Sequence, residues 1–340
     1  MIRKKILETI NKYNLIEKGD KIVLGVSGGP DSITMLYILN EFSKILNFEI
    51  IVAHINHGIR DEAVIDEKYV EEWCKKYYIP CYTLNCKVKD IAKDLKLGIE
   101  EAGRKVRYDF FDEICKKTGA NKIAIAHNKN DNCETIIMNV LRGSGSKGLC
   151  GIEPKQGKYI RPLIEIERKD IEDFCKIEKL EPRIDKTNFE NEYTRNKIRN
   201  IVIPYIVKEF NPNIINSLER LSKIMIEQEE YINEEVIKQY KNVLIDEIKN
   251  NENEYNIIVF NIKKFNSLAK IIEKKVILYA IQKLFGTTKR IEKVHLEDII
   301  KLCNNNIGNK YLTPNKNIKI VIKNKQIHIC KINWSIRSNT

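Results

Sequence analysis

The sequence predicts an α/β protein with a doubly wound parallel sheet, followed by a mainly helical linker and a smaller α+β C-terminal domain. Short, nearly continuous apolar runs alternate with amphipathic helical patterns through the first half of the chain. Such runs are typical of strands that are covered on both faces. The β-α-β-α order favours parallel strands joined by right-handed crossovers. A length of 340 residues predicts two or three domains.

The expected elements follow one another along the chain. An amphipathic pattern over 1–14 predicts a first helix, and KIVLGV (21–26), after a turn at 18–20, predicts the first strand. Strands and helices then alternate. The strands are expected at 49–55, 81–86 and 122–127, and the helices at 31–46, 62–78, 100–118 and 130–142.

The pattern changes after about residue 210. A single apolar stripe predicts one long helix; its members are Ile214, Leu218, Leu221, Met225, Ile232 and Val236. We therefore predict a first domain over 1–210, a helical linker over 211–245 and a C-terminal domain over 246–340.

The C-terminal domain is expected to mix helices and strands. Residues 256–304 predict one strand and two or three helices. IKIVIK and QIHIC predict short strands within 310–330, around a turn at Thr313-Pro314-Asn315.

Composition restricts the class of protein. Hydrophobic residues make up 43% and charged residues 31%, which allows a packed core and excludes a disordered chain. No apolar run has the roughly 18 residues of a membrane span, and the N-terminus lacks a signal-peptide pattern, so we expect a cytoplasmic protein without a membrane partner. The nine cysteines include no C-x-x-C pair, which argues against a disulfide scaffold or a zinc ribbon.

The net charge bears on the partner. The formal charge of +12 suits a polyanionic partner, although a basic surface that only keeps the protein soluble is an equal alternative.

A loop of sequence SGGPDS (27–32) lies between the first strand and the first helix after it, where parallel sheets bind ligands. Its glycines permit a tight turn and close approach of backbone N–H groups to an anion, and the helix N-terminus adds partial positive charge. We predict phosphate binding here, with Asp31 either holding Mg²⁺ or capping the helix. A second segment, GSGSKG (143–148), fits G-x-G-x-x-G but follows a helix, so we reject dinucleotide binding and expect a flexible loop near the active cleft.

Six motifs between residues 21 and 205 resemble, in order, those of the tRNA(Ile)-lysidine synthases, a family of the PP-loop ATP pyrophosphatase superfamily. They are SGGPDS (27–32), H-x-N-H-x-x-R (54–60), E-x-x-R-x-x-R-Y (101–108), A-H-x-x-x-D-x-x-E-T (126–135), R-P-L…R (161–168) and D-x-T-N…Y-x-R-N-x-x-R (185–199). The chain departs from the family pattern at Asn128 and Asn130, where a second histidine and an Asp-Asp pair are common. The last domain is expected to be shortened or absent.

The resemblance implies a Rossmann-like PP-loop fold and an enzyme that uses ATP and Mg²⁺. The implied reaction ligates L-lysine to C2 of the wobble cytidine of an isoleucine tRNA with a CAU anticodon, releases AMP and pyrophosphate, and changes codon reading from AUG to AUA. Residues 246–340 are then expected to bind tRNA. The alternatives are a PP-loop tRNA sulfurtransferase and a non-catalytic tRNA-binding relative; a homodimer is left open.

The motif residues receive expected roles. The catalytic residues are Asp31, Asp131, Glu134 and Arg104, with Asp31 also the metal ligand. The ATP-binding residues are Ser27, Gly28, Gly29, Pro30, Asp31, Ser32, His54 and His127. The tRNA-binding residues are Arg107, Arg142, Tyr193, Arg195 and Arg199.

Several of these roles have a structural alternative. His54 and His57 could bind a metal, but hydrogen bonds to ATP or nearby loops are favoured because no third ligand is suitably spaced. Arg104 and Arg107 share a helical face and either bind an anion or pair with the glutamates at 100–101.

The carboxylates and arginines further along the chain also have two interpretations. Asp131 and Glu134 would project together from a helix start, to hold Mg²⁺ or to bind and deprotonate the substrate ammonium, unless Asp131 is only a helix cap. Arg195 and Arg199, with Tyr193 for stacking, either face RNA or form an exposed basic helix face.

Overall fold

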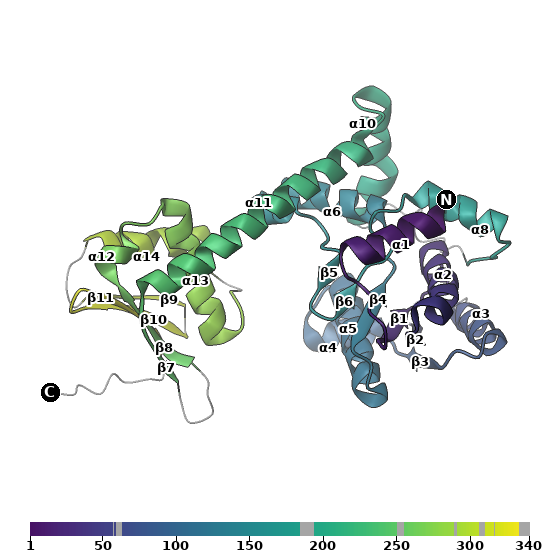
Figure 1. The fold of residues 1–340 in the computed structure, drawn as a ribbon, viewed down its shortest axis with the longest axis horizontal. Helices are drawn as coiled ribbons and strands as arrows, with labels where there is room; N and C mark the ends of the chain where they lie inside the picture. Colours follow the sequence, from purple (N-terminus) through teal and green to yellow (C-terminus); the bar gives the residue numbers. More distant parts are fainter. Residues whose placement is uncertain are drawn as a thin grey trace. The chain divides into compact units, whose positions relative to one another are not determined.

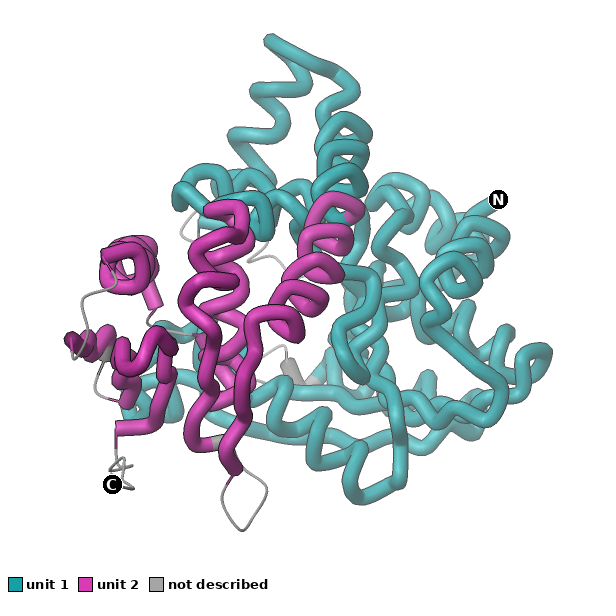
Figure 2. The backbone as a smooth tube through the Cα atoms, turned by 60° about the vertical axis from the view of Figure 1, so that its left-hand side comes forward, with its two compact units in different colours: residues 1–226 teal, residues 227–340 magenta. Residues whose placement is uncertain are grey.

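The protein divides into two compact units, residues 1–226 (unit 1) and 227–340 (unit 2), shown in Figure 2. The computed structural model describes residues 1–56, 58, 63–183, 194–249, 255–288, 291–305, 310–315 and 317–332. The division falls inside one long helix, α11 (Ile214–Val243). The assignment of a catalytic domain, a linker and a tRNA-binding domain stays a prediction.

A six-stranded sheet forms the centre of unit 1, in the order β3-β2-β1-β4-β6-β5 (Figure 1). Strands β3, β2, β1, β4 and β6 pair in parallel, and β5 pairs antiparallel with β6. The predicted doubly wound sheet is confirmed, and β1 and β4 flank the point at which strand order reverses. The strands are β1 (Lys21–Gly25), β2 (Glu49–Asn56), β3 (Cys81–Asn85), β4 (Lys122–Ile125), β5 (Lys155–Gln156) and β6 (Tyr159–Ile160).

Helices cover both faces of this sheet (Figure 1). Ile22 and Leu24 of β1 pack with α1, α2, α3 and α8, while Val23 between them packs with α5 on the other face. This alternation is the period of two that a pleated strand imposes. The helices are α1 (Ile2–Lys12), α2 (Pro30–Leu46), α3 (Ala63–Lys76), α4 (Val88–Leu95), α5 (Ile99–Thr118), α6 (Lys129–Leu141), α7 (Ser146–Leu149) and α8 (Arg168–Ile177).

Helical segments complete unit 1. After residue 194, α9 (Thr194–Lys197), a π-helical turn η2 (Ile198–Val202) and α10 (Ile203–Glu209) follow one another directly. The first turns of α11 are then held by a buried ammonium. Lys129 Nζ of α6 lies 2.7 Å from Glu219 Oε2 and 3.3 Å from Glu167 Oε1, and it also donates to the side chain of Asn216.

A five-stranded antiparallel sheet, in the order β7-β8-β11-β10-β9, forms unit 2. The C-terminal half of α11 and helices α12, α13 and α14 pack on one face, around Phe260, Phe265 and Ile320. The elements are β7 (Leu244–Lys249), β8 (Tyr255–Asn261), α12 (Ile262–Phe265), α13 (Lys270–Phe285), α14 (Lys293–Asn305), β9 (Tyr311–Asn315), β10 (Ile318–Lys323) and β11 (Gln326–Lys331). In neither unit is a described helix long and apolar enough to cross a bilayer.

The turn predicted at Thr313-Pro314-Asn315 is wrong. These residues lie in β9, an edge strand, where proline is tolerated because its missing N–H can face away from the sheet. The tight turn lies instead between β10 and β11, at Asn324 and Lys325, with φ of 51° and 59°. Two successive left-handed residues are what a two-residue type I′ hairpin requires.

The Lys129 network gives a stability prediction for unit 1. Lys129→Met removes a buried ammonium and leaves nearby carboxylates with fewer partners, so we expect a loss of about 3 kcal/mol in the free energy of unfolding. Urea unfolding can be followed through Trp73, which is 9% exposed, in a Trp334→Phe background. Lys4→Met, which removes an exposed ammonium from α1, should cost less than about 0.5 kcal/mol. Equal losses in the two variants would contradict the anchoring role.

Candidate active site

The loop SGGPDS joins β1 to α2 beside the reversal point of the sheet. Gly28 has φ +89°, which a residue with a Cβ rarely adopts, and Ser32 Oγ closes the loop by donating to Gly29 O at 3.0 Å. Ser27 N donates to Ser32 Oγ at 3.2 Å. Gly29 is the N-cap residue of α2, and no described side chain caps this helix start. Its first-turn amides are therefore available to an anion, as the sequence predicts.

An asparagine links this loop to the start of α6. Asn128 Nδ2 donates to Asp31 Oδ1 at 2.8 Å, while Asn128 Oδ1 accepts from Asp131 N at 2.9 Å. Asn128 N in turn donates to Asp131 Oδ2 at 3.0 Å, which completes a capping box. Asp31 is therefore not the cap of its own helix, and Asp131 is part of the capping box of α6.

The two aspartates are close enough to influence each other. Burial and the negative charge of Asp131 raise the pKa of Asp31 from 3.8 to about 6, although the Asn128 amide and the guanidiniums of Arg168 and Arg199 oppose the shift. Asp31 is thus a carboxylate whose negative charge is only partly compensated. A cation that binds beside it would lower its pKa.

Asp131 and Glu134 of α6 are buried against three arginines, and we call these five residues the carboxylate–arginine cluster. Glu134 is 1% exposed and forms a bidentate ion pair with Arg199. Arg199 Nε lies 2.6 Å from Glu134 Oε1, and Arg199 Nη2 lies 2.8 Å from Glu134 Oε2. Arg195 Nε lies 2.8 Å from Glu134 Oε2. The Nη2 atoms of Arg168, Arg195 and Arg199 lie 3.3, 3.3 and 3.1 Å from Asp131 Oδ1. A cation that binds these carboxylates must therefore displace guanidinium groups.

The cluster decides between interpretations that the sequence left open. Asp131 and Glu134 do project together from the helix start. Arg195 and Arg199 do not form an exposed basic face, because they are ion-paired and their side chains are only 26% and 21% exposed. Their spacing of four residues on successive helical segments explains why both reach one carboxylate.

A second group of arginines surrounds His127, just after β4. Burial and the positive charges of Arg161, Arg195, Arg104 and Arg107 lower the pKa of this imidazole to about 3. Burial, with the charges of Arg104 and Arg195, also lowers the pKa of Arg107. Arg104 Nη2 donates to Tyr108 Oη at 2.9 Å, and not to the glutamates at 100–101. Among the described side chains this region is rich in cations, which suits an anionic ligand.

His54 lies near the end of β2, beside the loop. It is 2% exposed, and its Nδ1 lies 2.8 Å from the carbonyl oxygen of Val26, so Nδ1 carries the proton and donates. Its Nε2 is then an acceptor, and this buried atom has no hydrogen-bond partner among the described residues. A buried acceptor without a donor is costly, which favours completion by a ligand.

The other predicted residues lie elsewhere. Arg142 is exposed at the C-terminal end of α6, opposite the end that carries Asp131. Tyr193, His57, Arg60 and the segment 185–188 lie outside the described residues.

Sequence reasoning missed three site residues. Arg161 and Arg168 stand in the R-P-L…R motif without an assigned role, and Asn128 figures there only as a departure from the family pattern. The R-P-L…R motif could have indicated that both arginines belong to the site. The role of Asn128 could not be predicted, because it bridges two segments that only the fold brings together. The glycine segment 143–148, predicted to be a flexible loop, runs into the short helix α7 (Ser146–Leu149).

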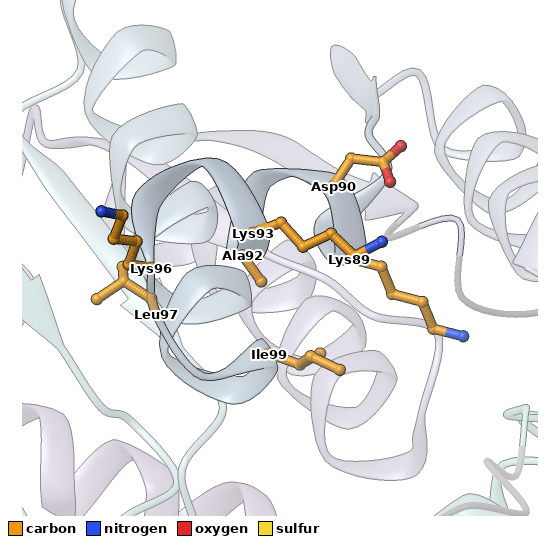
Figure 3. Close-up of a pocket in the computed structure, with 7 residues that line it drawn as sticks. All are labelled: Lys89, Asp90, Ala92, Lys93, Lys96, Leu97 and Ile99. Atoms are coloured by element: carbon orange, nitrogen blue, oxygen red, sulfur yellow. The ribbon is translucent and has the colours of Figure 1, made fainter.

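A surface hollow elsewhere on unit 1 holds none of the predicted site residues (Figure 3). Its lining comes from α4 and the start of α5: Lys89, Asp90, Ala92, Lys93, Lys96, Leu97 and Ile99. Within the described parts of the chain, no three His, Cys, Asp or Glu side chains come together as a metal-binding group.

Comparisons with known proteins identify the family. Residues 1–206 match a family model described as a PP-loop domain. A tRNA(Ile)-lysidine synthase of Clostridioides difficile (strain 630) is 43% identical over 329 residues, which cover 96% of this chain and 70% of that protein. A second, from Clostridium tetani (strain Massachusetts / E88), is 43% identical over 327 residues, 95% of this chain and 68% of that protein.

A solved structure shows the same fold. It is a U34-tRNA thiolase from Methanococcus maripaludis with a [4Fe-4S] cluster, with a TM-score of 0.53 and 21% identity over 65% of this chain and 78% of that one. At this identity the likeness extends to the fold alone.

The raised pKa of Asp31 predicts a pH-dependent cost to stability. Folding favours the protonated carboxyl of Asp31. Its contribution to stability is therefore complete below pH 3.8, and it is lost as the pH rises through about 6. Asp31→Asn removes the charge and keeps an acceptor for Asn128. At pH 8 we expect it to raise the free energy of unfolding by up to about 3 kcal/mol, at about 1.4 kcal/mol per pKa unit.

Urea unfolding at pH 8 and pH 4, followed through Trp73, measures this difference. It should nearly vanish at pH 4. Asp109→Asn, on the exposed face of α5, is the matched control and should change stability by less than about 0.5 kcal/mol at either pH. A variant less stable than the natural protein at pH 8 would show that the ionised Asp31 is well compensated.

Proposed function

This chain belongs to the tRNA(Ile)-lysidine synthase family of PP-loop proteins, and we propose that it ligates L-lysine to C2 of the wobble cytidine of an isoleucine tRNA with a CAU anticodon. ATP is cleaved to AMP and pyrophosphate, and codon reading changes from AUG to AUA. The observation that carries the proposal is the junction between an anion-binding loop and a buried carboxylate–arginine cluster, made by Asn128 at the reversal point of the sheet.

The reaction has two steps in this proposal. The loop (27–32) holds the terminal phosphates of ATP while the C2 oxygen of the cytidine attacks the α-phosphate and pyrophosphate leaves. The ε-amine of lysine then attacks C2 and AMP departs. Positioning and compensation of the charge that grows on the α-phosphate are the main contributions of the protein. Arg104, Arg107 and Arg195 supply positive charge near His127 for this purpose.

The residues at the loop fit a magnesium ion. Mg²⁺ prefers oxygen ligands and is usually held by one or two carboxylates together with substrate phosphates. Asp31 supplies such a carboxylate at the loop, and its raised pKa marks negative charge that a cation would compensate. The ion would neutralise phosphate charge when it is bound.

The carboxylates of Asp131 and Glu134 suit the ammonium of lysine, and the amine must lose its proton before it attacks. Both carboxylates are occupied by arginines in the described structure. We infer that phosphate charge draws one or more of these guanidiniums away and so opens the carboxylates to lysine. Binding of nucleotide and lysine is then coupled.

Unit 2 is suited to the remainder of the tRNA. Residues 227–340 hold 20 lysines and arginines against 13 aspartates and glutamates, so this third of the chain carries more than half of the net charge. Four exposed lysines surround the β10–β11 turn and the adjoining α12, and we call them the hairpin lysines: Lys263, Lys264, Lys323 and Lys325. The backbone N–H of Ile262 donates to the carbonyl oxygen of Lys325 at 3.2 Å, which joins the two segments. We propose that they bind tRNA phosphates.

The nine cysteines are free thiols, in keeping with a reducing cytoplasm, where we propose that the protein acts.

The reaction itself can be tested directly. Purified protein is treated with a chelator, supplied with Mg²⁺, ATP, labelled lysine and tRNA, and the digested tRNA is searched for a lysine-bearing cytidine. We expect this product, and we expect Asp31→Ala to lower pyrophosphate release at least about 10²-fold while circular dichroism shows a folded protein. Strict dependence on iron or a sulfur donor would favour thiolation. Binding of tRNA without pyrophosphate release would indicate a non-catalytic relative.

Nucleotide should increase the affinity for lysine. The expected effect is roughly 5–150-fold, the usual range for coupled sites, because phosphates compete for the arginines that now occupy Asp131 and Glu134. Calorimetric titration of L-lysine, with and without saturating magnesium α,β-methylene-ATP, measures it. L-Norleucine, which lacks the ε-ammonium, should bind in neither state. Equal lysine affinities in the two titrations would argue against the exchange of ion pairs.

The hairpin lysines should contribute to the salt dependence of tRNA binding. Replacing all four by glutamine should make the log–log salt slope less negative by about 0.7–0.9 for each phosphate that these side chains neutralise. Fluorescence anisotropy with labelled tRNA at several salt concentrations measures the slope. The matched control replaces four exposed lysines of unit 1, namely Lys4, Lys44, Lys176 and Lys179. If both quadruple variants keep the natural slope, tRNA binds elsewhere.

A further inference from the structure

Arg161 is a buried arginine whose hydrogen bonds to His127 and to the backbone go to neutral acceptors. It follows β6 directly and is 3% exposed. Its Nε donates to His127 Nδ1 at 3.2 Å, and its Nη1 donates to the carbonyl oxygen of Glu153 at 2.5 Å. No carboxylate among the described residues pairs with it. A buried guanidinium that makes no ion pair is costly, which suggests that Arg161 is retained for a function.

The contact between Arg161 and His127 fixes the position of a proton. A guanidinium has donors and no acceptor, so Nδ1 of His127 must present its lone pair. In a neutral imidazole the proton then lies on Nε2. Protonation of Nδ1 would set a second positive charge against Arg161, and Arg195, Arg104 and Arg107 add to the repulsion. Burial acts in the same direction, and the ring stays neutral.

The Nε2–H of His127 is thus a donor in a cationic environment. Among the described residues it has no hydrogen-bond partner, while the half-buried Arg107 and the exposed Arg104 lie on the neighbouring α5. An Nε2 lone pair, which the other tautomer would present, would be repelled by an oxyanion. The N–H together with nearby guanidiniums attracts one.

We propose that Arg161 is a positioning residue that holds His127 as the Nε2–H tautomer, so that this N–H donates a hydrogen bond to a phosphate oxygen of the bound nucleotide. The identity of that ligand rests on the proposed function, whereas the tautomer does not. Arg161 thereby acts on the reaction through His127, without touching the substrate.

The tautomer can be read on the protein alone. In protein labelled with ¹⁵N-histidine, long-range ¹H–¹⁵N correlations separate Nε2–H from Nδ1–H rings, and a His127→Gln variant assigns the signal among five histidines. We expect natural His127 to be wholly Nε2–H, and Arg161→Met to give a mixture of tautomers. Lys155→Met, which removes an exposed cation from the neighbouring β5, should leave the tautomer unchanged. An Nδ1–H ring in the natural protein overturns the proposal even if Arg161→Met does not fold, as does a pure Nε2–H ring in folded Arg161→Met.

Two further measurements test the consequence. Magnesium α,β-methylene-ATP should shift the Nε2–H resonance, and L-lysine alone should not; the reverse result would show that the oxyanion is the lysine carboxylate and would overturn the phosphate assignment.

Arg161→Met should lower kcat for pyrophosphate release by up to about 10²-fold, with less than twofold change in the KM for tRNA. Because the tautomer is read without substrate, absence of lysidine formation would contradict the proposed function and leave the tautomer result standing.

Discussion

The site depends on one side-chain amide. Asn128 holds Asp31 with its Nδ2, holds the Asp131 backbone with its Oδ1, and so ties the loop after β1 to the helix after β4. Asn128 itself is fully buried, so losing either partner would be costly. Asparagine suits the position because its amide can donate and accept at once, and at any pH. Through Asp131, the capping box of α6 and the carboxylate–arginine cluster are thereby placed beside the loop.

Charge is arranged on two scales in this molecule. The whole chain carries +12, yet the site holds three carboxylates close to three guanidiniums and is nearly balanced in itself. Long-range attraction of a polyanion is therefore a property of the surface, whereas the charges of Asp31 and of the cluster nearly cancel one another. Its arginines and carboxylates are counter-charges for each other, and the proposed exchange of partners would open them to substrates of either sign. The neutral His127 fits the same arrangement, because it accepts from Arg161 without adding charge.

Local patterns were sufficient for most of unit 1. Parallel strands that are buried on both faces are nearly continuous apolar runs, which are easy to recognise. The glycines at a strand–helix junction predict the phosphate-binding loop. The hairpin of β5 and β6 could not be predicted, because two-residue strands show no periodicity. The pairing of Arg199 with Glu134 spans 65 residues, and only the folded sheet brings them together. The turn at Asn324-Lys325 was missed because neither residue is glycine.

That turn has a consequence for protein engineering. Lys325 sits at φ 59°, a conformation that disfavours any residue with a Cβ and that glycine adopts freely. A thermostability screen would therefore select glycine at this position. If the lysine is retained under such selection, the reason lies in its charge and not in its backbone, because the hairpin itself would be better closed without it.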